Sequence, residues 1–184
     1  MLFRRDRVYR ECGGVAVYVR QLMKASRYKP PIVGDEVSHE LLWIKSEQGS
    51  DVTFIGALYH SPATFYQTNN LPDYIEATIS RIQLDFTGAH IILVGDLNQL
   101  SDTEVNVRTS MSSIDTQLTR GSNKLDRVYA SDHDYGDIKV VMSIVKSDHM
   151  AIIAYSGELV KAIGKTRRVC KFQKHTAAQH TNFL

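Results

Sequence analysis

The chain has 184 residues, of which 43% are apolar and 23% are charged, and its formal net charge is +2. This composition is that of an ordinary folded domain, and it excludes a disordered or fibrous chain. No apolar run approaches the roughly 20 residues of a membrane helix, and the first residues do not open a signal peptide. The two cysteines, Cys12 and Cys170, form no CxxC pair. We therefore expect an intracellular protein without a disulfide framework, a cysteine zinc site or a membrane partner.

The charges are unevenly distributed along the chain. Residues 1–27 hold seven Lys and Arg against two acids, residues 161–184 hold six with no acid, and residues 28–160 keep nine bases and 18 acids. Basic ends attract a polyanion, and an acidic centre can hold a cation. This pairing is typical of a metal-dependent enzyme that acts on phosphate esters. A solvated charged surface is the simpler alternative.

The predicted elements begin with strands. Residues 15–19 are an apolar, β-branched run that follows two glycines and predicts the first strand. Runs 40–44 and 52–59 flank a polar turn and predict a hairpin or meander. Residues 25–38 lie between these runs, and we interpret them as a loop because they contain two prolines and a glycine.

After Pro72 the apolar spacing becomes that of an amphipathic helix. Its stripe consists of Ile75, Ile79, Ile82 and Phe86. Residues 90–95 follow as a continuous apolar run, which predicts a strand buried on both faces. Residues 99–124 are polar and predict surface loop, with a short helical turn near residues 114–118. Three more strands are expected at residues 125–130, 138–145 and 150–155.

Two polar side chains follow the buried strand at its carboxyl end. Asp96 and Asn98 project on the same side because strand side chains alternate, and open sheets bind ligands at such ends. A carboxylate there can orient or deprotonate a water, and an amide can donate to an anionic oxygen. A plain strand-to-turn junction is the alternative, since Asp and Asn are common there.

A second candidate site contains Asp148 and His149. Histidine can place an N–H on a phosphoryl oxygen when a carboxylate orients its ring, and Asp126 in its strand can be that carboxylate. Asp148 is expected to reach a metal or the attacking water. The tripeptide Ser-Asp-His also occurs at residues 131–133, but there it lies in a polar turn, so we interpret His133 as a surface residue.

The order of these motifs resembles that of the endonuclease/exonuclease/phosphatase superfamily. Three other segments, at residues 13–20, 40–44 and 59–62, are similar to the endonuclease domain of non-LTR (LINE-type) retrotransposon polyproteins. Residues 166–184 are similar to the segment that leads from that domain towards the reverse transcriptase. The superfamily motifs are Gly95-Asp96-Leu97-Asn98, Thr119-Arg120, Leu125-Asp126-Arg127-Val128 and Ser147-Asp148-His149.

The resemblance implies an α/β fold, a two-sheet α/β sandwich of the DNase I-like kind, over residues 1–160, followed by a basic tail at 161–184. It implies Mg²⁺-dependent hydrolysis of a phosphodiester, that is, nicking of DNA. Asp96 would orient or activate the water, and Asn98 would hold the phosphate. His149, paired with Asp126, would stabilise charge on the phosphoryl oxygens, and Asp148 would lie beside the metal.

Three more residues acquire roles through the resemblance. Tyr59 would touch the phosphate, and Thr119 and Arg120 would line the DNA-facing loop. For Tyr59 the alternative is a half-buried strand aromatic, and for Arg120 it is a solvated charge. The implied partners are DNA and the reverse transcriptase of a parent polyprotein, and the implied place of action is the nucleus.

One departure from the family pattern concerns the metal. Family members carry two strands ahead of the Gly-Gly strand, the first ending in an asparagine and the second bearing a glutamate that ligates the metal. Glu11 and Glu40 do not match that glutamate. The resemblance therefore implies a copy that lacks the first strands, with little or no magnesium-dependent nicking. The alternatives are a phosphatase or lipid phosphodiesterase of the same fold and a non-catalytic fragment that binds nucleic acid.

Overall fold

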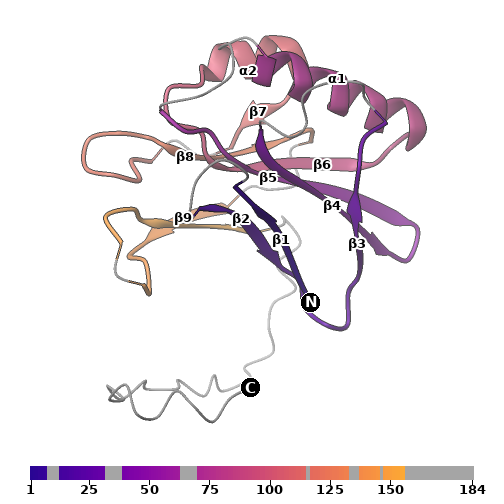
Figure 1. Cartoon of the computed structure of the whole chain (residues 1–184), viewed down its shortest axis with the longest axis horizontal. Coiled ribbons are helices and arrows are strands. Elements are labelled where there is room, and N and C mark those ends of the chain that lie inside the picture. The colour runs from indigo at the N-terminus through magenta and orange to yellow at the C-terminus, as the bar shows by residue number, and fades with distance from the viewer. Residues whose placement is uncertain are drawn as a thin grey trace.

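The computed structural model of the chain describes residues 1–7, 13–31, 39–62, 70–114, 117–132, 137–145 and 147–155. These residues form a mixed α/β fold in three layers, in which a central sheet separates two helices from two short hairpins (Figure 1). Among the described residues, no helix is both long and apolar enough to cross a membrane.

The central sheet has six strands in the order β3-β4-β5-β6-β8-β7. Only β5 and β6 are parallel, and every other neighbouring pair is antiparallel. The predicted hairpin is confirmed as β4 and β5, and the strand predicted at residues 90–95 is confirmed as β6. Only one face of β6 is fully buried, through Ile91 and Leu93, because Ile92 and Val94 on the other face are partly exposed. The strand bounds are β3 Lys24–Tyr28, β4 Glu40–Gln48, β5 Asp51–Tyr59, β6 His90–Asp96, β7 Ser112–Ser113 and β8 Asp126–Ala130.

The predicted amphipathic helix is confirmed as α1, Asn70–Asp85, which provides the crossover between the parallel strands β5 and β6. Its stripe of Ile75, Ile79 and Ile82 is buried against one face of the sheet. That face presents alternating side chains, among them Trp43 of β4 and Leu93 of β6. Burial of this stripe supplies most of the stability of the helix, because propensity alone rarely holds a helix of this length.

The opposite face of the sheet is covered by two hairpins. β1 (Leu2–Asp6) pairs with β2 (Gly14–Tyr18), and β9 (Asp137–Val141) pairs with β10 (Ala151–Tyr155). Sheet side chains that alternate with the core-facing ones are buried on this side, for example Leu42, Ile44 and Val128. The α/β class is therefore confirmed, and in the described residues the second sheet of the sandwich consists of two separate two-stranded sheets.

Three elements differ from the sequence-based expectation. Residues 25–28, expected as the start of a loop, belong to the edge strand β3, which needs few apolar side chains because of its place at the edge of the sheet. Residues 102–109, expected as surface loop, form helix α2 (Asp102–Thr109). Ser101 caps α2 by accepting a hydrogen bond from the Glu104 N–H at 3.4 Å, and this Ser-x-x-Glu spacing was an available signal. Residues 2–6 form β1, which we did not predict.

Several expectations fall outside the described residues. The basic tail and the domain boundary after residue 160 lie in the range 156–184, and Glu11, Cys12, His133 and Cys170 are likewise not described. The helical turn near residues 114–118 includes two residues that are not described, and Ser112 and Ser113 before it form β7. These expectations stay predictions.

Candidate functional site

Four polar side chains lie side by side across four strands of the central sheet. Glu40 of β4 pairs with Tyr59 of β5, which in turn pairs with Asp96 of β6. Asp96 pairs with Asp126 of β8. Partners on neighbouring strands project from the same face of a sheet. The four side chains therefore form one row, named here the polar row, on the face opposite α1.

His149 reaches the polar row from the loop before β10. Its Nδ1 lies 2.7 Å from Oδ2 of Asp126, and both side chains are mostly buried. The carboxylate orients the imidazole ring and favours a proton on Nδ1, which leaves Nε2 as the nitrogen that can face a substrate. The structure thus brings together the two residues that the sequence analysis paired.

Asp96 occupies the centre of the polar row. Burial raises the pKa of its carboxyl group, and the negative charge of Asp126 raises it further, against a hydrogen bond that the Asn98 N–H donates at 3.2 Å. The Asp96 carbonyl accepts a hydrogen bond from the His60 N–H at 2.8 Å. A carboxylate with a raised pKa is a better proton acceptor for an attacking water.

Asn98 lies where the chain turns away from β6. Its φ of 44° is in the left-handed region, which asparagine tolerates better than most residues. Its Nδ2 donates to the His60 carbonyl at 2.8 Å, so the amide is held next to the end of β5. The turn begins at Gly95, whose φ is 146° and whose Cβ, if present, would lie 1.8 Å from the Leu58 carbonyl oxygen.

Thr119 does not lie on a surface that DNA could touch, contrary to the expectation. Its side chain is fully buried, and its hydroxyl accepts hydrogen bonds from the N–H groups of Leu125, at 3.1 Å, and Asp126, at 3.0 Å. A hydroxyl that caps two main-chain donors is a structural group. Thr119 therefore supports the start of β8 and with it the main chain of Asp126.

Arg120 is half exposed and forms an ion pair with Asp148, with Nη2 and Oδ2 2.6 Å apart. A hydrogen bond from its own main-chain N–H and the charge of Arg120 keep the pKa of the Asp148 carboxyl below its ordinary value. We expected Asp148 beside the metal. The structure pairs it with Arg120, and its place beside a metal stays a prediction. The positive charge of Arg120 also acts on Asp96.

Arg7 is a residue of the site region that sequence analysis missed. Its Nε donates to Oε1 of Glu40 at 2.7 Å, and its guanidinium lies 5.4 Å from the ring centroid of Tyr59. Arg7 and Glu40 are 33 residues apart in sequence. No local pattern could connect them, because the contact depends on how the β1–β2 hairpin packs on the sheet.

Solved structures show what this architecture is similar to. The endonuclease domain of TRAS1, a telomere-specific non-LTR retrotransposon, matches with a TM-score of 0.57 and 12% identity, over 84% of this chain and 80% of that one. Truncated TDP2 from Caenorhabditis elegans matches with a TM-score of 0.54 and 20% identity, over 74% and 67%. The chain therefore has a DNase I-like fold. No protein-family model and no curated protein sequence matches it.

The polar row contains donors that fit a divalent metal ion. In the described part of the chain, one group of acidic and histidine side chains could hold an ion. It consists of Asp96, Asp126 and His149, with ligand atoms within 4.8 Å of one another. Hard divalent cations take carboxylate oxygens, and a cation there would offset the repulsion between the two carboxylates. Since Nδ1 of His149 already bonds to Asp126, we expect Asp96 and Asp126 to be the ligands.

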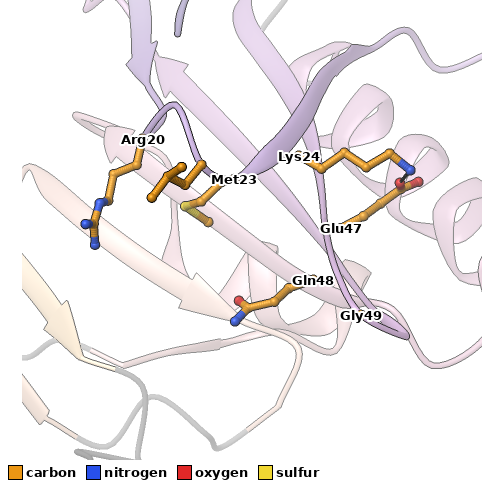
Figure 2. A pocket seen from close by; sticks show the side chains of 7 residues that line it. Arg20, Met23, Lys24, Glu47, Gln48 and Gly49 are labelled. Atoms are coloured by element: carbon orange, nitrogen blue, oxygen red, sulfur yellow. Dashed lines mark ion pairs between the residues drawn. The ribbon is translucent and has the colours of Figure 1, made fainter.

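A hollow of about 500 Å³ lies away from the polar row (Figure 2). It is next to the turn between β4 and β5, and the ion pair between Lys24 and Glu47 lies on its wall. Glu47 on its wall is seven residues along β4 from Glu40, which corresponds to roughly 23 Å of strand. The hollow is therefore not part of the candidate site. Its lining residues are Arg20, Leu22, Met23, Lys24, Glu47, Gln48 and Gly49.

Proposed function

We propose that the polar row hydrolyses phosphodiester bonds in DNA with a divalent cation, as a nicking endonuclease. The observation that carries the proposal is the meeting of Asp96, Asp126 and His149, from three separate segments, with ligand atoms within 4.8 Å. Such a cluster supplies a base, an oriented hydrogen-bond donor and cation ligands in one place. Fold alone does not select a substrate. The basic residues 1–27 and the likeness to a retrotransposon endonuclease domain support DNA.

Each residue of the row has a role in this proposal. Asp96 accepts a proton from the attacking water, whose oxygen bonds to phosphorus as the bond to the leaving oxygen breaks. His149 is oriented by Asp126, which accepts from Nδ1, and in this role the ring carries a proton on both nitrogens, so that Nε2 donates a hydrogen bond to a phosphoryl oxygen on which negative charge develops. Asn98 and Tyr59 hold the phosphate. A bound divalent cation, which we expect to be Mg²⁺, supplies charge neutralisation at the phosphoryl oxygens.

The test is conversion of supercoiled plasmid to the open circle in Mg²⁺ and in Mn²⁺. We expect slow nicking that EDTA abolishes and that His149→Ala lowers by about 100-fold or more. His90→Ala is the matched control, because His90 also bonds an aspartate, Asp132, with 2.5 Å between Nδ1 and Oδ2, but at the opposite end of β6. Nicking that is unchanged in His149→Ala, or that is equally lost in His90→Ala, would contradict the proposal.

Binding without cleavage is the second candidate function, and the Arg120–Asp148 ion pair favours it. Because Asp148 is paired with Arg120, the group that could bind a cation contains only two carboxylates, Asp96 and Asp126. Its affinity for a cation would therefore be low. Titration of a DNA duplex at two salt concentrations, in EDTA, tests this function. Binding that weakens steeply with salt, together with no nicking in either metal, would favour it. Turnover of a soluble phosphomonoester without nicking would instead favour a phosphatase of the same fold.

A further inference from the structure

The guanidinium of Arg127 lies buried directly behind the polar row. Arg127 follows Asp126 in β8, so its side chain projects from the opposite face of the sheet. Only 7% of the residue is exposed. A buried guanidinium loses a large hydration free energy and is tolerated only when its N–H groups are satisfied.

The partners of the two Nη atoms of Arg127 lie between the end of β6 and the first residue of α2, while its Nε donates to the Lys124 carbonyl at 3.4 Å. Its Nη2 donates to the carbonyl of Asn98 at 2.5 Å. Its Nη1 donates to the carbonyl of Leu100 and to Oδ1 of Asp102, the latter at 3.1 Å. The rigid, planar fork of an arginine thus fixes residues 98–102 at three points, which a flexible ammonium cannot do.

Tyr129 completes this network. The Tyr129 hydroxyl donates to Asp102, and the Tyr129 side chain is fully buried. Burial raises the pKa of Tyr129, and so does its hydrogen bond to Asp102. Burial alone would raise the pKa of the Asp102 carboxyl, but the Tyr129 hydrogen bond and the charge of Arg127 keep it below its ordinary value. Asp102 is therefore an anion at neutral pH, and Arg127 is its buried counter-charge.

The hydrogen bond from Arg127 to the Asn98 carbonyl connects this network to the candidate site. Asn98 has a positive φ of 44°, and a non-glycine residue keeps such a conformation only when its surroundings hold it. The Asn98 N–H donates to Asp96 and its side-chain amide lies next to the polar row. The Asn98 carbonyl is held from the other side of the sheet by Arg127.

We propose that Arg127 is a positioning residue, which acts on the candidate site by clamping the main chain of Asn98. The clamp itself follows from the contacts of Arg127, and its effect on phosphate binding rests on the proposed function. With the clamp released, Asn98 would sample other conformations, and phosphate binding would weaken more than the chemical step. The expected kinetic signature is therefore a rise in KM that is larger than the fall in kcat.

The first experiment requires no catalysis. Arg127→Lys keeps the positive charge but lacks the planar guanidinium that donates to several acceptors at once. Tyr129→Phe is the matched control, because it alters the same network without removing a contact to Asn98. Hydrogen exchange of the Asn98 N–H, followed by NMR, should become at least tenfold faster in Arg127→Lys and change less than threefold in Tyr129→Phe. Unchanged exchange in Arg127→Lys, or an equal rise in both variants, would overturn the proposal. If Arg127→Lys does not fold, Arg127→Gln replaces it, because its neutral amide still donates to one carbonyl.

The second experiment is a double-mutant cycle on the affinity for a DNA duplex in EDTA. Arg127→Lys and Asn98→Ala should each weaken binding by about fivefold, and the double variant should bind as Asn98→Ala does, because coupled residues are not additive. Effects that multiply would show that Arg127 does not act through Asn98. Wild-type protein that neither binds nor nicks DNA would refute the proposed function, and the exchange measurement would still decide the clamp.

Discussion

The Nδ1 atom of His149 and the Oδ2 atom of Asp126 lie 2.7 Å apart, although the two residues are 23 positions apart in sequence. This bond joins the start of β8 to the loop before β10. It fixes the imidazole at the end of the polar row, where its ring can act on a bound phosphate. The pair should therefore behave as one unit in kinetics.

A double-mutant cycle on this pair tests that expectation. Asp126→Asn and His149→Ala should each lower nicking by about 100-fold. The first replaces the carboxylate that orients the imidazole ring by a neutral amide, and the second removes the ring. The double variant should be little worse than the more damaging single variant, because residues that act together are not additive. Plasmid nicking rates measure all three. Losses that multiply would show that the two side chains act independently.

Thr119 should govern stability through its buried hydroxyl. Thr119→Val keeps the shape but leaves the N–H groups of Leu125 and Asp126 without an acceptor. A buried unsatisfied donor costs about 1–3 kcal/mol, so we expect a loss of that order or somewhat more in the free energy of unfolding. Thr119→Ser keeps the hydroxyl and should retain most of the stability. Urea denaturation compares the two, and equal losses would contradict the role of the hydroxyl.

Gly95 should tolerate no side chain. Its φ of 146° suits glycine alone, and an added Cβ would lie 1.8 Å from the Leu58 carbonyl oxygen. Gly95→Ala should therefore lower the free energy of unfolding by about 3 kcal/mol or more. Gly49→Ala is the control, because Gly49 has a φ of 62° and open space around it. It should cost about 1 kcal/mol. Thermal or urea denaturation would contradict this prediction if both substitutions cost the same.

Glu47 should make stability depend on pH in the acid range. Its hydrogen bonds to Lys24 and Lys45 lower its pKa from 4.5 to about 2. A lowered carboxyl pKa stabilises the folded state above the ordinary value, and this stabilisation disappears as the pH falls through the folded value. The Tm difference between wild type and Glu47→Gln should therefore be constant above pH 5 and shrink towards pH 2. A difference that does not change with pH would refute the ion pairs.

Much of the fold follows from local sequence patterns. Period-two and continuous apolar runs predicted β4, β5, β6 and β8, and the stripe of Ile75, Ile79 and Ile82 predicted α1. Such patterns show local structure because apolar residues gather on the faces that an element buries. Polar elements were missed for the same reason. β3 is an edge strand, and α2 buries few side chains, Val105 and Thr109 among them, so neither carries a strong apolar signal.

The sequence by itself determined which chemical groups this protein carries at its strand ends: Asp96, Asn98, Asp126 and His149 are identified by their places after or before apolar runs. Only the tertiary structure decided which of them meet. The register of β4, β5, β6 and β8 sets Glu40, Tyr59, Asp96 and Asp126 at one level. Packing also buried Thr119 and Arg127, although polar residues are ordinarily expected on the surface. Which strands are neighbours, and which polar residues become buried, depends on contacts between distant segments, and no local pattern in the chain specifies those contacts.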